Sequence, residues 1–435
     1  MGVLRARKWI LSGTSASSSK SLAHTLLIEN GFVLPSSKGL YSLLPLGQRV
    51  IDKLCRILDA EFQNIGGQKV SMPVIGTKNL WDKTKRWDAM GSEMMKFTDR
   101  VGNQLCLQPT AEEMCTDIVS RFSPVKKHML PLMLYQIGEK FRDEMNPRFG
   151  LMRAREFLMK DMYSFDIDDN SAMMTYKKVQ KAYDKIFKDI LELDVIKVEA
   201  DSGVHGGTIS HEYHLKSNLD EDFVELCQSC GKMTKSDSKC ECGQIRMEKL
   251  STVEIGHTFH LGTKYSEALG ATFAGKPLDM CCFGIGVSRL LPAAVDALTI
   301  SSKALRLPRA ISPFDVVIII KKSMVSNVLV EMTASSAGRY LKGGVLLDDR
   351  VEMSPGKRIH DANRLGIPYI VVLANETERS LASTSPPIVE VFTTEPKSDE
   401  VISNGSMTLE QFVTFCQSST RRGTFSDPIF PSVAN

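Results

Sequence analysis

One segment of the chain, residues 140–166, combines basic, acidic and aromatic side chains at an unusual density. It reads "KFRDEMNPRFGLMRAREFLMKDMYSFD" and holds six Lys or Arg and five Asp or Glu residues. If its halves are neighbouring strands, alternate side chains share a face. The shared faces then carry Arg142 with Glu144, and Arg153 with Arg155 and Phe157. Guanidinium groups bind phosphate oxygens and an aromatic ring stacks on a base, so the segment predicts a nucleoside triphosphate site. Cross-strand ion pairs on a surface hairpin are the alternative.

A second candidate cation, Arg289, follows two glycines in "CCFGIGVSRLL". Gly284 and Gly286 allow the backbone to approach a ligand closely. Arg289 falls where a helix is expected to begin, and a cation there is unfavourable unless an anion neutralises it. So short a motif also fits a simple turn, and its interpretation as a phosphate site depends on the arginines of residues 140–166.

Four of the ten cysteines are paired by short spacings. Cys227 and Cys230 lie in "CQSC", and Cys240 and Cys242 lie in "CEC". Paired thiolates separated by a short polar loop predict a tetrahedral zinc site. The second spacing is shorter than the usual C-x₂-C, so a reduced loop that contains cysteines is the alternative. The cysteines do not resemble a secreted disulfide framework, and a reducing compartment is expected.

Several elements are expected to position these residues. Helical spacing is clear in "GQRVIDKLCRILDAEFQNIG", and strands are expected at "QKVSMPVI", "MLYQIGEKFRDE", "RAREFLMKDMYSF", "TVEIGHTFHLGTKYS" and "PLDMCCFGIG". "LRLPRAISPFD" is typical of a linker. Beyond it, strands and helices alternate as in a small α/β domain with a mostly parallel sheet.

Composition narrows the class of protein only slightly. The chain has 435 residues, of which 43% are hydrophobic and 24% charged, as in soluble proteins of two or three domains. Apolar runs are strand-sized, so no membrane partner is expected. The net charge of +3 permits an RNA partner without arguing for one.

The N-terminal segment has a distinct composition. It contains Arg5, Arg7, Lys8 and Lys20 with six serines, and its first acidic residue is Glu29. An Arg- and Ser-rich, acid-poor start predicts an organellar import sequence. A disordered basic tail on a cytosolic protein is the alternative.

The segment "FRDE…PRFGLMRAREF" resembles motif 2 of the class II aminoacyl-tRNA synthetases, and most closely that of the prolyl-tRNA synthetases. Further blocks follow the family order: "GLYSLLPLGQRVIDKL…GGQKVSMPVI" for motif 1, "LQPTAEE", "GHTFHLGTKYSEA", "CCFGIGVSRLL" for motif 3, and "LLDDR…SPGKRIHDANRLGIP". The resemblance covers residues 30–375. It implies an α+β catalytic domain with an antiparallel sheet and then a small α/β anticodon-binding domain.

The resemblance also implies domain boundaries. A mitochondrial transit segment would occupy residues 1–28, the catalytic domain 29–305 and the anticodon-binding domain 311–435. Motifs 1, 2 and 3 would lie near 41–75, 138–166 and 278–295. A short Cys-containing insert near 225–250 would replace the editing domain of bacterial-type relatives.

The implied activity is the ATP-dependent activation of L-proline and its transfer to tRNA(Pro) by a homodimer in the mitochondrial matrix. ATP and Mg²⁺ would be needed, and zinc is possible at the cysteines. The implied ATP residues are Arg142 at the α-phosphate and proline carboxylate, Glu144 at the adenine amine, Phe157 stacked on the ring, Arg153 at the outer phosphates and Arg289 at the γ-phosphate. Arg142 and Arg289 would be catalytic, because fixed cations offset the charge that gathers when a carboxylate attacks phosphorus.

Proline would be held by side chains from two blocks: Thr110 and Glu112 at the secondary amine, Arg142 at the carboxylate, and His257 and Phe259 at the ring. Val253 and Ile255 are expected to continue the face of His257 and Phe259. The sequence has Ala111 where relatives often have His and Gln108 where they often have Gly, which leaves details of the pocket open. Asp349, Arg350 and Lys357 would read the anticodon.

Two other functions fit parts of the pattern. A catalytically silent relative that binds RNA would have lost motif arginines, whereas Arg142 and Arg289 are present here. A sister synthetase for threonine or glycine is disfavoured by the length of the match through residues 140–166.

Overall fold

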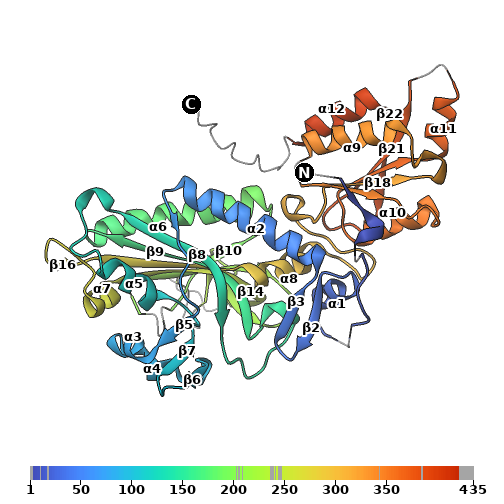
Figure 1. The fold of residues 1–435 in the computed structure, drawn as a ribbon. Coiled ribbons are helices and arrows are strands. Elements are labelled where there is room, and N and C mark those ends of the chain that lie inside the picture. Colours follow the sequence, from blue (N-terminus) through green and yellow to red (C-terminus); the bar gives the residue numbers. More distant parts are fainter. Residues whose placement is uncertain are drawn as a thin grey trace.

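The computed structural model describes residues 3–420, except 10, 17–18, 202, 204–205, 208, 236–239, 241, 243–246, 342 and 384–385. Two sheets organise the chain, a large one built mostly from residues 68–286 and a small one from 316–408 (Figure 1). Among the described residues, no helix is both long enough and apolar enough to span a membrane.

The large sheet has nine strands within the described residues, all antiparallel except for the parallel pair β4–β8. In spatial order its strands are β10 (Ile196–Glu199), β11 (Ile209–Lys216), β14 (Met247–Gly262), β17 (Asp279–Gly286), β9 (Glu156–Asp166), β8 (Leu132–Phe141) and β4 (Gln68–Lys69), with β12 (Asp222–Cys227) and β13 (Met233–Thr234) attached beside β14. The predicted hairpin is confirmed as β8–β9, which pairs from Leu132↔Phe165 to Phe141↔Glu156. The expected strand at "QKVSMPVI" is shorter than predicted, because β4 ends before the segment reaches Pro73.

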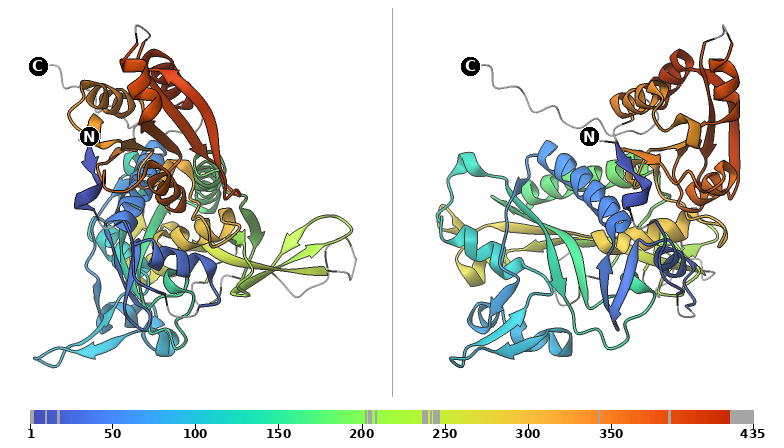
Figure 2. Two further views of the ribbon diagram at one scale, coloured as in Figure 1. Left: turned by 90° about the vertical axis from the view of Figure 1, so that its right-hand side faces the viewer. Right: turned by 45° about the vertical axis from the view of Figure 1, so that its right-hand side comes forward.

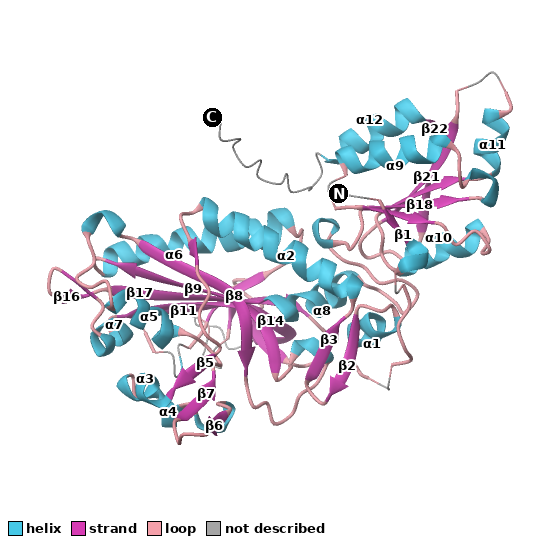
Figure 3. Ribbon diagram, in the orientation of Figure 1, coloured by secondary structure: helices cyan, strands magenta, loops and turns pink. Residues whose placement is uncertain are grey.

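Helices cover one face of this sheet (Figure 3). They are α1 (Leu22–Glu29), α2 (Pro45–Asn64), α6 (Asp169–Asp184), which continues as a π-helical turn (Lys185–Ile190), and α8 (Val287–Leu298). Tyr135, Met162 and Phe283 point from the sheet into this helical core and are fully buried. Because strand side chains alternate, the residues between them face the opposite side, where a ligand can reach them.

Smaller elements frame that opposite side (Figure 1). The helices are α3 (Lys78–Lys83), α4 (Arg86–Ala89), α5 (Glu112–Ser120) and α7 (Lys264–Leu269). The short strands are β2 (Val33–Ser37) with β3 (Leu40–Leu43), β5 (Ile75–Thr77), β6 (Lys96–Thr98) and β7 (Gln104–Leu107) in one sheet, and β15 (Thr272–Phe273) with β16 (Lys276–Pro277). Cys115 of α5 and Tyr265 of α7 are fully buried in a second core with Phe165 and Met280.

The small sheet has six strands within the described residues. Their order is β1 (Leu4–Arg5), β19 (Val345–Asp348), β18 (Val316–Ile320), β20 (Tyr369–Leu373), β21 (Ile388–Thr394) and β22 (Val401–Thr408), of which the first four are parallel. The helices are α9 (Val328–Tyr340) and α12 (Leu409–Thr420) on one face, with α10 (Pro355–Arg364) and α11 (Asn375–Leu381). The predicted α/β domain with a mostly parallel sheet is confirmed.

The predicted linker connects α8 to β18 without a strand or α-helix of its own, but much of it is buried. Leu305 and Phe314 are fully buried, and the Arg306 guanidinium donates to Asn363 Oδ1 (2.6 Å). Arg49 of α2 lies 4.4 Å above the Phe314 ring and donates to the Pro313 carbonyl (2.8 Å). The prolines and polar residues of this segment resemble a loop, but its apolar residues pack into one core with both sheets.

The N-terminal segment is part of both packed units. Strand β1 pairs with β19 in parallel, with Leu4 opposite Leu346. Helix α1 is capped by Ser21, whose hydroxyl accepts from the His24 N–H (3.1 Å), and it buries Leu26 in the core of the large sheet. The predicted transit boundary at residue 28 therefore falls inside a buried helix, while import itself stays a prediction.

Candidate active site

A cavity of about 390 Å³ lies on the side of the large sheet opposite the helices. All nine side chains that the sequence assigns to ATP and proline line it: Thr110, Glu112, Arg142, Glu144, Arg153, Phe157, His257, Phe259 and Arg289. They come from the β8–β9 hairpin, β14, the starts of α5 and α8, and the loops beside them. Segments far apart in the sequence thus meet in one cavity.

Strand alternation explains much of the lining. On β9, Phe157, Met159 and Asp161 face the cavity, whereas Lys160 and Met162 are buried on the helical side. On β17, Cys282 and Gly284 face the cavity. The sheet therefore presents one row of each strand to the ligand side.

Two arginines converge on the cavity. Arg142 directly follows β8 and lies over the Phe157 ring, with its guanidinium carbon 5.3 Å from the ring centre. Arg289 is the third residue of α8, as predicted, and donates to the Glu254 carbonyl (3.0 Å). Burial and the positive charge of Arg289 both lower the pKa of Arg142. Two positive charges that line one cavity and act on each other create a site for an anion.

The other two predicted ATP residues form an ion pair. Arg153 Nε lies 2.9 Å from Glu144 Oε2, and Arg153 Nη1 donates to Glu221 Oε1 (2.9 Å). Arg148 binds the other oxygen of Glu221 (2.7 Å). The expectation that Arg155 shares their face is wrong, because Arg155 precedes β9, binds Asp143 (2.5 Å) and does not line the cavity.

Glu112 is the centre of a fully buried network. Its Oε2 accepts from Thr110 Oγ1 (2.7 Å) and from Arg86 Nη1 (3.0 Å), and its Oε1 accepts from Cys282 Sγ (3.5 Å). Arg86 Nη1 also binds Glu113 Oε1 (3.0 Å), but only Glu112 lines the cavity. Burial raises the pKa of Glu113, although Arg86 opposes that shift. Buried carboxylates need such partners, and of these two carboxylates Glu112 is the one that faces the ligand side.

A β-bulge changes the predicted face of β14. Tyr213 pairs with Gly256 and His214 with Glu254, so Ile255 is the extra residue. The bulge places Glu254 beside His257, with Glu254 Oε1 3.4 Å from His257 Nδ1. The expectation that Val253 continues the face of His257 is wrong, since Val253 packs in the helical core. Bulges re-aim side chains near functional sites in this way.

Contacts with two neighbouring side chains orient the His257 ring. Its Nε2 lies 2.5 Å from Ser210 Oγ, and its ring stacks on Phe259 with centres 3.8 Å apart and planes at 17°. Burial would raise the pKa of Glu254, but the hydrogen bond to His257 and the charge of Arg289 lower it overall. The Glu254 carboxylate is therefore ionised at neutral pH.

Several lining or supporting residues escaped the sequence analysis. Glu254, Glu212 and Asp161 line the cavity, and Arg86 supports it from behind. Asp161 is held by a buried ion pair with Lys140 (2.8 Å). Asp161 lies within the charged segment 140–166, so its alternation with Phe157 and Met159 on β9 could have identified it. Arg86 lies in a polar stretch with no local signal.

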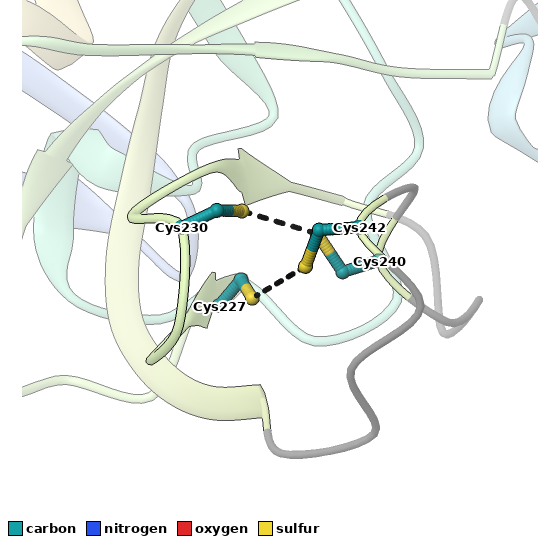
Figure 4. Close-up of side chains that lie close together, drawn as sticks. All are labelled: Cys227, Cys230, Cys240 and Cys242. Carbon is teal, nitrogen blue, oxygen red and sulfur yellow. Dashed lines mark hydrogen bonds between the residues drawn. The ribbon is translucent and has the colours of Figure 1, made fainter.

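The four paired cysteines lie together at the far end of β12 (Figure 4). Their four sulfur atoms all lie within 4.8 Å of one another. Cys227 Sγ is 3.6 Å from Cys242 Sγ, and Cys230 Sγ is 3.4 Å from Cys240 Sγ. These distances exclude disulfides, and all four cysteines are free thiols.

The predicted anticodon residues lie at the end of β19 and in α10. Lys357 Nζ (3.3 Å) and Arg350 Nη1 (3.1 Å) share the Asp361 carboxylate. Asp349 Oδ1 accepts from the backbone N–H of Arg7 (3.0 Å), so the N-terminal segment contacts this group. Sequence reasoning gave no sign of that contact.

Comparison with known proteins agrees with this architecture. The family described as "tRNA synthetase class II core domain (G, H, P, S and T)" matches residues 95–298, and the family described as "Anticodon binding domain" matches residues 315–417. The fold is similar to the crystal structure of prolyl-tRNA synthetase from Cryptosporidium parvum complexed with L-proline and AMP. That match has a TM-score of 0.72 at 15% identity and covers 95% of this chain and 77% of the other.

Relatives found by sequence share a higher identity with this chain than that structure does. The chain is 40% identical over 365 residues to the probable mitochondrial proline–tRNA ligase of Homo sapiens. The aligned region covers 80% of this chain and 76% of the human protein. It is 38% identical over 370 residues to the probable mitochondrial enzyme of Schizosaccharomyces pombe, covering 81% and 86%. It is 37% identical over 380 residues to the proline–tRNA ligase of Ehrlichia chaffeensis, covering 82% and 88%. Together with the cavity, these matches show that the chain belongs to the proline–tRNA ligase family of class II aminoacyl-tRNA synthetases.

Proposed function

We propose that this protein activates L-proline with ATP and transfers it to tRNA(Pro) in the mitochondrial matrix. The observation that carries the proposal is the convergence of Arg142, Arg289 and Glu112 on one cavity. The two arginines suit the phosphates of ATP and the carboxylate of proline. The buried Glu112 carboxylate suits the secondary ammonium of proline. The mitochondrial names of the human and fission-yeast relatives and the basic N-terminal segment support the compartment.

In the first step a carboxylate oxygen of proline attacks the α-phosphorus of ATP. The new P–O bond forms prolyl-adenylate, and the bond to the β-phosphate breaks to release pyrophosphate. Arg142 contacts both anions and offsets their repulsion, and Arg289 binds the γ-phosphate. Phe157, beneath Arg142, stacks on the adenine, and Glu144 accepts from its amine.

Glu112 and Thr110 orient proline for this attack. The secondary ammonium binds the Glu112 carboxylate, whose position is fixed by Arg86. The stacked pair of His257 and Phe259 forms a flat wall for the pyrrolidine ring. Positioning of this kind supplies much of the rate enhancement, so no general base is required.

In the second step a ribose hydroxyl at the 3′ end of tRNA attacks the activated acyl carbon, and AMP leaves. Arg153 would leave its ion pair with Glu221 to reach the outer phosphates in the first step. Asp349, Arg350 and Lys357 contact the anticodon from the small sheet, where unstacked bases offer hydrogen-bonding edges.

Magnesium fits a cluster in the cavity wall. Glu212, Glu254 and His257 each place a ligand atom within 4.8 Å of the others. Carboxylate oxygens are the donors that Mg²⁺ prefers, so Glu212 and Glu254 would hold the ion. When bound, Mg²⁺ neutralises phosphate charge. The four cysteines do not line the cavity.

A homodimer would bury the edge of the large sheet beyond β4. This edge corresponds to motif 1, and the segment after β4 exposes Val74 (41%) and Ile75 (44%). Changing both to aspartate is expected to convert a dimer into a monomer in light scattering, with Met145→Asp, also exposed, as the control. A monomer in the unmodified protein would refute the dimer.

The central test is ATP–pyrophosphate exchange with a panel of amino acids. Proline alone should support exchange, and Arg142→Gln should reduce it at least 100-fold, as with other transition-state charge donors. Arg155→Gln is the matched control, since Arg155 lies in the same hairpin outside the cavity, and it should retain most activity. Exchange with threonine or glycine would identify a sister synthetase, and no exchange with any amino acid a silent relative.

A further inference from the structure

We propose that Cys227, Cys230, Cys240 and Cys242 bind one zinc ion and that this ion anchors an arm beside the active-site cavity. The arm consists of β12, β13 and the first half of β14, and it projects from the body of the protein (Figure 2, left view). The four cysteines meet at its end, where β12 pairs with the start of β14 through Cys227↔Met247.

The sulfur positions fit a tetrahedral zinc ion. Zinc–sulfur bonds of about 2.3 Å separate the sulfurs of such a site by about 3.8 Å. The two measured contacts, 3.6 Å for Cys227–Cys242 and 3.4 Å for Cys230–Cys240, are close to that value. Both distances are far longer than the roughly 2.05 Å of a disulfide bond. The C-x-C spacing that argued against zinc in the sequence therefore does not prevent four sulfurs from converging.

The backbone of the first pair is arranged as a metal-binding turn. The Cys227 N–H donates to the Lys232 carbonyl (2.9 Å), and the Gly231 N–H donates to the Cys227 carbonyl (2.9 Å). Gly231 has φ +71°, a conformation that glycine adopts without strain. This hydrogen-bonded turn fixes the relative positions of Cys227 and Cys230, so the backbone holds the first two sulfurs on one side of the site.

The arm reaches the cavity through Lys235. Lys235 Nζ lies 2.5 Å from Glu212 Oε2, and Glu212 lines the cavity. Lys235 directly follows β13, three residues after the turn that carries Cys230. An ion that closes the turn therefore also fixes the strand that holds Lys235 against the cavity wall.

The first measurement is the metal content of the full-length protein purified without added metal or chelator. We expect one zinc per chain, lost in Cys230→Ser and Cys242→Ser. Cys55→Ser is the matched control and should keep its zinc, because Cys55 lies in α2, away from the arm. Cobalt(II) should replace zinc and give the absorption bands of a tetrahedral thiolate site in the control but not in either arm variant.

Folding and the ligase reaction are read separately. Circular dichroism should show that the arm variants keep the body fold, and trypsin should cut after Lys232 several-fold faster in them than in the control. Lys235→Met should keep its zinc and raise the KM for ATP about 2- to 5-fold, as expected for a partly exposed ion pair. Zinc-free protein with four alkylatable thiols, a disulfide between them, or iron in place of zinc would overturn the proposal. The metal content, the cobalt spectrum and the trypsin cleavage can be read whether or not the protein activates proline.

Discussion

Glu112 and Glu113 provide a matched test of the proline site. Both side chains are fully buried and both lie 3.0 Å from the same nitrogen of Arg86, but only Glu112 lines the cavity. We compare Glu112→Gln with Glu113→Gln. Either change removes one of two carboxylates around one guanidinium, so both should destabilise the fold, and Glu113→Gln less so because burial already raises the pKa of Glu113.

The two variants should differ in substrate binding. A hydrogen bond to a charged group contributes about 1.5–3 kcal/mol, which corresponds to a roughly 10- to 150-fold change in affinity. Glu112→Gln should raise the KM for proline by that factor, because the neutral amide cannot balance the secondary ammonium. Glu113→Gln should leave the KM within about 3-fold, since its carboxyl does not face the ligand.

The assay is proline-dependent ATP–pyrophosphate exchange, with urea unfolding of both variants as the measure of stability. The KM for ATP serves as an internal reference, since neither residue is assigned to the nucleotide. If Glu113→Gln raised the KM for proline as much as Glu112→Gln, the effect would come from loss of Arg86 positioning, and direct contact between Glu112 and proline would be refuted.

Three further outcomes are expected. Burial lowers the pKa of Lys160 from 10.5 to about 7, so between these pH values the unfolded chain binds more protons than the folded protein and stability rises with pH. Relative to Lys160→Met, the free energy of unfolding should therefore rise by about 2 kcal/mol from pH 7 to pH 9 in urea titrations. Parallel pH dependences of the two proteins would contradict this. Glu221→Gln removes one carboxylate partner of Arg153 and leaves the ion pair with Glu144; it should lower the KM for ATP up to about 5-fold in exchange assays, whereas an increase would show that Glu221 orients Arg153 for ATP. Replacing Arg5 and Arg7 with alanine leaves Asp349 and Glu352 unbalanced and should raise the KM for tRNA several-fold in aminoacylation without changing proline-dependent exchange; an equal effect on exchange would contradict it.

Local patterns predicted the elements that carry the cavity. Helical spacing identified α2, and two strand-like segments joined by a loop identified β8 and β9. Since strand alternation is a local property, it was enough to bring Arg142 and Phe157 into one expected site, and the resemblance to a family added Arg289 to it. The resemblance to a family supplied Thr110 and Glu112, whose type and spacing carry no signal by themselves.

The remaining features depend on contacts between distant segments. The bulge at Ile255 exists only in the pairing of β14 with β11, so periodicity along β14 could not reveal that Glu254 faces the cavity. Arg86 meets Glu112 across a chain separation that no local pattern records. The burial of the linker around Phe314 could not be predicted for the same reason, because its partners lie in α2 and the small sheet.

Strand β1 ties the beginning of the chain to a position 342 residues later, where the Arg7 N–H meets Asp349. A contact of such sequence separation can form only after both segments are available, and contacts of this kind are typically late in folding. The small sheet should therefore first fold with β19 as its edge and accept β1 as the closing strand. Until then the backbone of residues 4 and 5 would stay unpaired, whereas in the folded protein it is committed to the pairing with β19.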